Sequence, residues 1–252
     1  MSIIENIKKI RELTKASMSL CKASLEEAGN DLEKALEILK KKGIQRAEKR
    51  SGNTSSEVVI VTKNSEKKDK IILLKFAVET DFVAKNEEFG LFMEYCAKEF
   101  MATNVEYNEV IINFDLFNIQ NIKFEEAIKM VSGRFGENVM LQECYVDSIS
   151  NDQVSCYYSH NRFLNQCLSK ISVYIKANND SEILKKMAMH ASWSRALVVY
   201  EKDLEKIEYD KNISLDDLVL EKQEINYLGK NQMIGDLMKE NNIQILEYKI
   251  LA

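Results

Sequence analysis

Two separate stretches of the chain show the same succession of patterns, a pair of apolar runs followed by an amphipathic segment. In the first stretch, residues 58–61 and 70–78 are β-branched or aliphatic and flank the polar segment 64–69, which is the pattern of a β-hairpin. Large apolar side chains then recur at helical spacing over residues 89–100. The same order returns from residue 139 onward. We therefore predict an α+β fold whose body consists of two related β-plus-helix halves.

Local signals indicate where the elements of this body begin and end. Asn86 can cap the first helix of the body. Residues 122–132, between the halves, are expected to be helical and to end at Gly133. For the second half we predict strands at 139–148, 154–158 and 168–176, a helix after 178–181, a helix start at Ser214, a short helix over 233–240 and a terminal strand over 243–251.

The first fifty residues carry helix signals without strand signals. Ser2 and Glu5 have the spacing of a capping box at the start of a first helix. Gly29 is a natural end for a second helix, and Asp31 can cap a third. That third helix is expected to end at Lys40–Lys42 and Gly43. Three short helices in succession predict a compact helical bundle.

A polar segment separates this bundle from the body. Residues 51–56 contain no apolar side chain and are typical of a linker. Residues 1–56 hold 12 Lys and Arg against 8 Asp and Glu, a net charge of +4, so a total of −5 leaves −9 for the rest. We predict a helical domain at 1–50, a linker at 51–56, and a body divided into 57–134 and 135–252.

Several functional classes do not fit this sequence. It lacks the ~20 consecutive apolar residues of a membrane span and the basic leader of a secretory signal, so we expect a cytoplasmic protein. Its five cysteines never form a C-x-x-C pair, which argues against disulfides and zinc. His160 and His190 lie outside metal-binding spacings, and a phosphate-binding glycine loop is absent. We expect no metal, no cofactor and no direct binding of nucleotide.

Two other activities stay open as alternatives. A hydrolase could combine His160 with Cys156 or Cys167, although their spacing does not favour it. An RNA-binding module is the second alternative, because residues 133–136 read G-R-F-G and match the G-x-x-G loop of KH domains. The charge of −9 on residues 57–252 disfavours nucleic acid as a partner.

The string T-D-F-V-A-K at residues 80–85 lies between a predicted strand end and a predicted helix start. Phe82 is there either a core residue or an aromatic anchor on a rigid loop that faces a partner. The residue pattern alone leaves both interpretations open.

This string, continued by N-E-E-F at 86–89, is similar to the most specific string of the translation elongation factor Ts family. The strings F-G-E-N at 135–138, Y-S-H at 158–160 and A-M-H-A at 188–191 resemble others of that family and follow in the same order. Residues 1–50 are similar to its ubiquitin-associated-like helical domain. The resemblance covers nearly the whole chain.

The resemblance implies a guanine-nucleotide exchange factor and not an enzyme. Such a factor binds the GTPase elongation factor Tu and promotes the release of GDP, so that GTP can be reloaded during translation elongation. By resemblance, the tip at Asp81 and Phe82 inserts near the magnesium and phosphate site of that GTPase. The implied partner-binding residues are Met18, Thr80, Asp81, Phe82, Val83, Ala84, Lys85, Phe135, Gly136 and His160.

The chain also departs from the family pattern. The first module has Lys15 and Ser17 in place of two glycines, so its contact surface is expected to differ. Asn161 replaces a glycine, and residues 193–195 replace prolines. Residues 201–223 are too few for the long helical hairpin that many relatives insert. We therefore expect a monomer that forms a 1:1 complex with elongation factor Tu.

Overall fold

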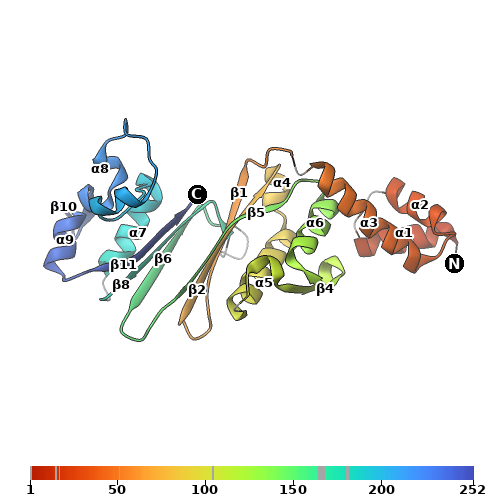
Figure 1. Ribbon diagram of the computed structural model, residues 1–252, viewed down its shortest axis with the longest axis horizontal. Helices are drawn as coiled ribbons and strands as arrows, with labels where there is room; N and C mark the ends of the chain where they lie inside the picture. The colour runs from red at the N-terminus through yellow and green to blue at the C-terminus, as the bar shows by residue number, and fades with distance from the viewer. Residues whose placement is uncertain are drawn as a thin grey trace. The chain divides into compact units, whose positions relative to one another are not determined.

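The computed structural model describes residues 2–14, 16, 18–50, 52–103, 105–163, 168–179 and 182–252, with the backbone alone at 46–48 (Figure 1). By its contacts the chain divides into two compact units, Met1–Val59 with Phe76–Cys144 and Ile60–Lys75 with Tyr145–Ala252. Helices precede a body of mixed helices and sheets, which confirms the predicted α+β class.

The first unit begins with helices α1 (Ile3–Thr14), α2 (Met18–Glu27) and α3 (Leu32–Arg50). The predicted capping box is confirmed, because Ser2 N donates to Glu5 Oε2 at 2.8 Å and Glu5 N donates to Ser2 Oγ at 3.3 Å. A small core joins the helices, built from Ile10, Cys21, Leu25, Ala35 and Leu39.

The connection between α2 and α3 also follows the predicted signals. Gly29 has a φ of +62°, the left-handed conformation that ends a helix with little strain when the residue is glycine. Asp31 Oδ1 then accepts hydrogen bonds from backbone amides in the first turn of α3, at 3.1 and 3.2 Å.

Two predicted helix ends are wrong, and both errors concern a glycine. Helix α3 continues through Gly43 to Arg50, and α6 (Phe124–Phe135) continues through Gly133 and begins two residues later than predicted. The two glycines meet where α3 packs against α6, and a Cβ added to Gly133 would lie 2.7 Å from the Gly43 backbone. They permit a close helix crossing, and Gly136 with a φ of +71° ends α6 instead.

Strands β1 (Glu57–Asn64) and β2 (Lys70–Val78) form the predicted hairpin. They belong to a sheet with the strand order β5–β2–β1–β7, where β5 is Met140–Ser148 and β7 is Leu168–Ser169. The strands β1, β2 and β5 each begin in one unit and end in the other.

The core of the first unit's body is rich in aromatic rings. Phe76 of β2 packs edge-on against Phe89 of α5 (Glu87–Ala102), with 6.0 Å between ring centroids, and against Phe124 of α6 at 6.5 Å. Asn86 Oδ1 accepts from Phe89 N at 3.1 Å, which confirms the predicted cap.

A hairpin between α5 and α6 was not predicted. It comprises β3 (Ile111–Phe114) and β4 (Ile119–Lys123), joined by the short helix η2 (Asp115–Phe117), and it follows the short helix η1 (Tyr107–Glu109). Asn118 takes the left-handed conformation in its turn, with a φ of +55°. The strands are too short for period-two alternation to be recognised.

The second unit contains an antiparallel sheet with the order β11–β8–β6, formed by Ile245–Leu251, Ile171–Ala177 and Val154–His160. Helix α7 (Glu182–Ser194) packs along this sheet (Figure 1). Its residues Leu184, Met187 and Ala191 are buried in the core, as predicted. The predicted strand 168–176 is divided at Lys170 into β7 and β8.

The remaining elements of the second unit are short. Residues 201–223 form η3 (Glu201–Lys206), α8 (Leu215–Leu218) and η4 (Leu220–Lys222), so the prediction that they hold no long helical hairpin is confirmed. The helix start at Ser214 is confirmed as well, because its hydroxyl accepts from Asp216 N at 3.3 Å. The hairpin β9 (Glu224–Tyr227) and β10 (Lys230–Met233) was not predicted, and α9 (Ile234–Glu240) follows it.

Across the described residues, every helix is too short or too polar to cross a membrane.

Candidate functional site

Phe82 is the most exposed aromatic side chain of the described residues, with 84% of its surface open to solvent. It lies on α4 (Asp81–Ala84), a single helical turn that follows the end of β2. Val83 and Ala84 of the same turn are buried, which fixes the turn on the body and directs Phe82 outward. The interpretation of Phe82 as a core residue is therefore wrong, and the interpretation that its ring faces a partner stays a prediction.

A salt bridge closes the outer side of this turn. Lys85 Nζ lies 2.8 Å from Asp81 Oδ2, four residues away along α4 and its C-terminal cap. The hydrogen bond to Asp81 raises the pKa of Lys85 above its ordinary value. Because both side chains are solvent-exposed, the pair contributes little to stability, and it leaves a carboxylate and an ammonium beside Phe82.

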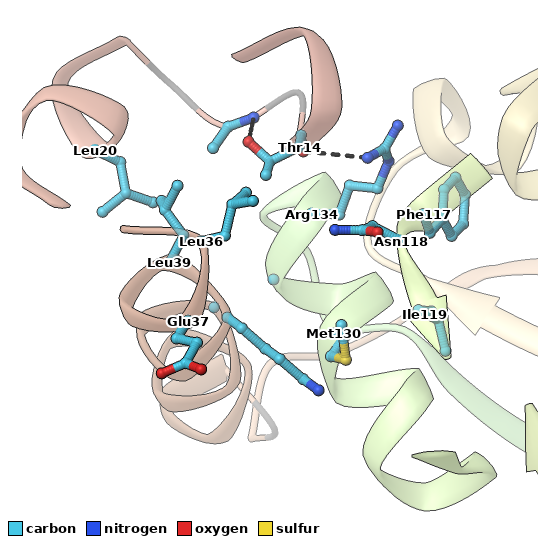
Figure 2. Close-up of a pocket in the computed structure, with 14 residues that line it drawn as sticks. Thr14, Leu20, Leu36, Glu37, Leu39, Phe117, Asn118, Ile119, Met130 and Arg134 are labelled. Carbon is cyan, nitrogen blue, oxygen red and sulfur yellow. Dashed lines mark hydrogen bonds between the residues drawn. The ribbon is translucent and has the colours of Figure 1, made fainter. Parts of the chain in front are cut away.

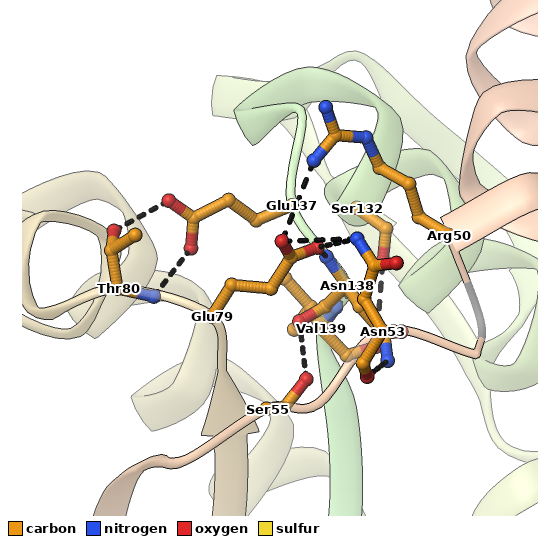
Figure 3. A network of polar contacts seen from close by, with 9 residues as sticks. All are labelled: Arg50, Asn53, Ser55, Glu79, Thr80, Ser132, Glu137, Asn138 and Val139. Carbon is orange, nitrogen blue, oxygen red and sulfur yellow. Dashed lines mark hydrogen bonds and ion pairs between the residues drawn. The ribbon is translucent and has the colours of Figure 1, made fainter.

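Thr80, at the base of the turn, is held by a residue from elsewhere in the chain. The Glu137 carboxylate accepts a hydrogen bond from Thr80 N at 3.0 Å through Oε2 and another from the Thr80 hydroxyl through Oε1 (Figure 3). Glu137 follows Gly136, the left-handed residue that ends α6. The turn between α6 and β5 thus contacts the base of α4.

Glu79 ties the same turn to the end of β2. Its carboxylate accepts hydrogen bonds from Asn138 N and, at 3.1 Å, from Asn53 Nδ2, and Arg50 Nη1 lies 3.5 Å away (Figure 3). The Asn138 amide is the main cause that lowers the pKa of Glu79, with smaller effects from Asn53 and Arg50. The carboxylate is therefore held in its charged form.

Asn138 completes the anchoring of the turn. Its side chain donates to Asn53 O at 3.1 Å, and its carbonyl accepts from Ser55 Oγ at 3.1 Å. One residue further, Val139 N donates to Ser132 Oγ at 3.1 Å. Asn138 is buried, so these bonds satisfy polar groups that water does not reach.

Phe135 and Gly136 lie next to this network but differ in their exposure. The Phe135 ring is half-buried between Phe89 and Phe117, with 5.8 and 5.7 Å between ring centroids. Gly136 is exposed. Gly136 directly precedes Glu137, which holds Thr80 at the base of the tip, whereas the Phe135 ring packs against other aromatic rings of the core.

The G-R-F-G segment does not have the geometry of an RNA-clamping loop. Gly133 and Arg134 lie in the last turn of α6, and Gly133 is pressed against Gly43. The Arg134 guanidinium is almost fully buried and donates to Glu88 Oε2 at 2.9 Å and to Thr14 O at 3.2 Å. Its positive charge is therefore already paired inside the protein, which argues against the RNA-binding alternative.

Arg134 also borders a cavity of about 240 Å³ between α3 and α6 (Figure 2). Most of its walls are apolar, with Leu20, Leu36 and Leu39 on one side and Met130 and Phe117 on the other. Thr14 and Arg134, which are joined by a hydrogen bond, both line the cavity, so it lies where the helical module packs against α6.

Met18 begins α2 and is 60% exposed, so its side chain is accessible on the first unit. The altered positions Lys15 and Ser17 lie outside the described residues.

His160 belongs to the second unit and stands at the end of β6. Its side chain is exposed, and its ring lies 6.3 Å from that of Tyr158. Asn161, which follows it, has a φ of +53°, so this asparagine adopts the left-handed conformation that a glycine takes more easily.

The hydrolase alternative finds no support at His160. Cys156 lies four residues earlier on β6, which places the two residues about 13 Å apart along an extended strand. This separation far exceeds hydrogen-bond reach. Burial raises the pKa of the Cys144 thiol to about 11, which disfavours a thiolate there, and Cys167 lies outside the described residues.

His190 has the structural role that its position on α7 indicates. It is half-buried, and its Nε2–H donates to Gln223 Oε1 at 2.9 Å. Gln223 Nε2 donates in turn to the carbonyls of Asp216 and Asp217. The histidine thus joins α7 to the α8 segment. Over the described ranges, moreover, His, Cys, Asp and Glu side chains do not gather in threes that could hold a metal ion.

The sequence profile of the family described as "Elongation factor TS" matches residues 79–250 of this chain. The chain belongs to the elongation factor Ts family. The match begins at Glu79 and includes the tip, the anchored turn and the second unit's sheet and helices.

Individual elongation factor Ts sequences extend the similarity toward the N-terminus. The chain is 31% identical to the factor of Clostridium botulinum (strain Alaska E43 / Type E3), over 83% of this chain and 69% of that protein. It is 32% identical to the factor of a Nitratiruptor species, over 89% of this chain and 74% of that protein. With the factor of Aquifex aeolicus it shares 37% identity over 58% of this chain, and the match spans about half of that protein.

Sequence reasoning missed the residues that support the tip in this elongation factor Ts family member. Glu137 and Asn138 were recognised as part of the F-G-E-N string, but their contacts to Thr80 and Glu79 were not predicted. The available signal was a pair of polar side chains directly after Gly136, which ends α6 in the left-handed conformation, because such side chains can hydrogen-bond to backbone groups. What the sequence could not show was which backbone that is.

Proposed function

We propose that this protein binds elongation factor Tu and promotes the release of GDP from it, so that the GTPase can be reloaded with GTP during translation elongation. Membership of the elongation factor Ts family supports the assignment to translation elongation. The observation that carries the mechanism is Phe82, a large apolar side chain held in solvent on a one-turn helix. Exposed aromatics on rigid supports are typical hot spots of protein interfaces.

In this proposal Phe82 and Asp81 contact the GTPase near its magnesium and phosphate site. Complete burial of a phenylalanine side chain contributes about 1.5–3 kcal/mol, and most of the Phe82 surface is still available for burial. That energy corresponds to a factor of about 10 to 100 in an equilibrium constant. It accelerates nucleotide release only if the contact is stronger with the nucleotide-free GTPase than with the GDP form. By thermodynamic linkage, bound nucleotide then weakens the affinity of the GTPase for this protein by the same ratio.

The rigid support of the tip favours this mechanism. Val83 and Ala84 are buried, and Thr80 is hydrogen-bonded to Glu137, so little conformational entropy is lost when Phe82 is covered. More of the burial energy therefore remains available to distinguish between the two forms of the GTPase.

The proposed contact set includes the tip, the turn that follows α6, Met18 of α2 and His160 of the second unit. It consists of Met18, Thr80, Asp81, Phe82, Val83, Ala84, Lys85, Phe135, Gly136 and His160. Within it, the buried Val83 and Ala84 act by supporting the turn, and the half-buried Phe135 can offer only the part of its side chain that is not packed in the core. The factor itself would perform no covalent chemistry, use no cofactor, and act as a monomer in a 1:1 complex.

The test is the release of fluorescent GDP from elongation factor Tu of the same organism. We expect the protein to accelerate release, and Phe82→Ala to lose most of the acceleration while it melts at the parent's temperature. The matched control is Trp193→Ala, because Trp193 is also an exposed aromatic, at 82%, but lies on α7 of the second unit. Parent protein that leaves the release rate unchanged would refute the proposal, and equal losses in both variants would refute the special role of Phe82.

A further inference from the structure

Helix α4 is too short to be stable by itself. A single turn pays the cost of helix nucleation without the gain of propagation. Two backbone hydrogen bonds define it here, from Ala84 N to Thr80 O at 3.2 Å and from Lys85 N to Asp81 O at 3.0 Å. Its persistence therefore depends on tertiary contacts at Thr80, Val83 and Ala84.

The contact at Thr80 is unusual for its position. Thr80 is the N-cap residue of α4, where a threonine hydroxyl commonly accepts a hydrogen bond from the first turn. Here the hydroxyl donates to Glu137 Oε1, and the Thr80 amide donates to Glu137 Oε2. The carboxylate thus grips the residue from which the turn starts, and hydrogen bonds to a charged acceptor are stronger than neutral ones.

Glu137 can hold Thr80 because its own backbone is fixed. The next residue, Asn138, makes three hydrogen bonds (Figure 3). Its backbone N–H donates to the Glu79 carboxylate, its backbone carbonyl accepts from Ser55 Oγ, and its side chain donates to Asn53 O. Glu79 is in turn the residue just before Thr80 in the chain. The hydrogen bonds therefore connect residues on both sides of the base of α4, and Glu137 is the residue of this network that contacts Thr80.

From this geometry we infer that Glu137 is a positioning residue of the exchange reaction: its carboxylate fixes Thr80 so that α4 presents Phe82 to the GTPase. The inference rests on the proposed function and adds to it a residue that acts through Phe82. It predicts that loss of the two hydrogen bonds to Thr80 loosens the tip and reduces exchange, while the rest of the unit stays folded.

Substitutions at both ends of the contact test the inference. Glu137→Ala removes both hydrogen bonds, and we expect it to slow factor-stimulated GDP release about tenfold. Glu137→Gln is expected to restore most activity, since its amide can accept from Thr80 N and donate to the Thr80 hydroxyl. Thr80→Val loses the hydroxyl alone and should fall between them. Glu125→Ala is the matched control, because Glu125 is an exposed carboxylate of α6 that pairs with Lys129 along that helix.

A double-mutant cycle separates positioning from a general structural effect. If Glu137 acts through Phe82, Glu137→Ala should change GDP release less than about twofold when Phe82 is already alanine. The same tenfold loss in both backgrounds would overturn the inference, because Glu137 would then act independently of the tip.

Hydrogen exchange of the free protein provides a readout that needs no partner. In Glu137→Ala the amides of Ala84 and Lys85 should exchange about tenfold faster, while those of α6 keep their protection. Unchanged amides in α4 would overturn the inference. A third outcome separates the two proposals. Faster exchange of the α4 amides in Glu137→Ala, together with a Phe82→Ala variant that stimulates GDP release as well as the parent does, would confirm that Glu137 positions α4 and refute the proposed role of Phe82.

Discussion

Alanine substitutions at Gly43 and Gly133, the two glycines where α3 packs against α6, should have opposite effects on the stability of the fold. Both Gly43 and Gly133 lie inside helices, so each substitution gains about 1 kcal/mol of helix propensity. The structure distinguishes them by the space for a Cβ. At Gly43 the nearest atom would be the Gly133 Cα at 3.8 Å, an ordinary contact, whereas at Gly133 the Cβ would lie 2.7 Å from three backbone atoms of Gly43.

The size of the difference follows from this asymmetry. Because the propensity gain is common to both variants, it cancels in the comparison. What remains is the overpacking at Gly133, which cannot be relieved by a side-chain rotation, since backbone atoms are in the way, and which typically costs about 1–3 kcal/mol. We expect Gly43→Ala to be slightly more stable than the parent, and Gly133→Ala to be less stable than Gly43→Ala by that amount.

Urea unfolding of the parent and the two variants, with equal m-values as the check on two-state behaviour, measures this difference. In thermal melts, each kcal/mol should correspond to about 2–4 °C for a chain of this size. A Gly133→Ala variant as stable as Gly43→Ala would refute the reasoning, because the two helices would then have room to separate without loss of packing.

Three further predictions concern charge, nucleotide and assembly. The pKa of Glu79 is lowered below its ordinary value of about 4.5, so its contacts stabilise the fold above that pH and are lost as the pH falls through the lower, folded-state pKa. Glu79→Gln should accordingly be destabilised at neutral pH and should approach the parent's stability in acid unfolding below pH 4.5; a constant gap would contradict this. Equilibrium dialysis should detect no binding of labelled GTP to the isolated protein, because the sequence lacks a phosphate-binding glycine loop. Micromolar binding would contradict the proposal that only the GTPase binds nucleotide. Light scattering across a concentration series should give a mass of 29.1 kDa, and a dilution-insensitive mass of twice that value would show a dimer.

Much of this protein could be predicted from residues that act on their near neighbours. The capping box of Ser2 and Glu5, the caps at Asp31 and Asn86, and the left-handed Gly29 all depend on contacts within four residues. The same holds for the apolar faces of α5 and α7, because the helical period alone selects which side chains are buried. The strings that indicate the elongation factor Ts family are likewise local.

The tertiary structure decided the features that depend on what packs against a residue. Gly43 and Gly133 are residues at which a helix commonly ends, yet α3 and α6 both continue through them. The two glycines lie where these helices pack together, and at Gly133 the backbone of Gly43 leaves no room for a Cβ. The exposure of Phe82 is of the same kind. Its apolar ring is equally suited to a core, and only the burial of Val83 and Ala84 directs it into solvent.

The contacts that support the tip could least be predicted from local sequence patterns. Glu137 lies 57 residues from Thr80 in the chain, and no local pattern pairs them. The pairing arises because the end of α6 and the end of β2 meet in the folded first unit. The sequence alone therefore identified the tip, and the long-range hydrogen bonds of the folded chain decided how it is held.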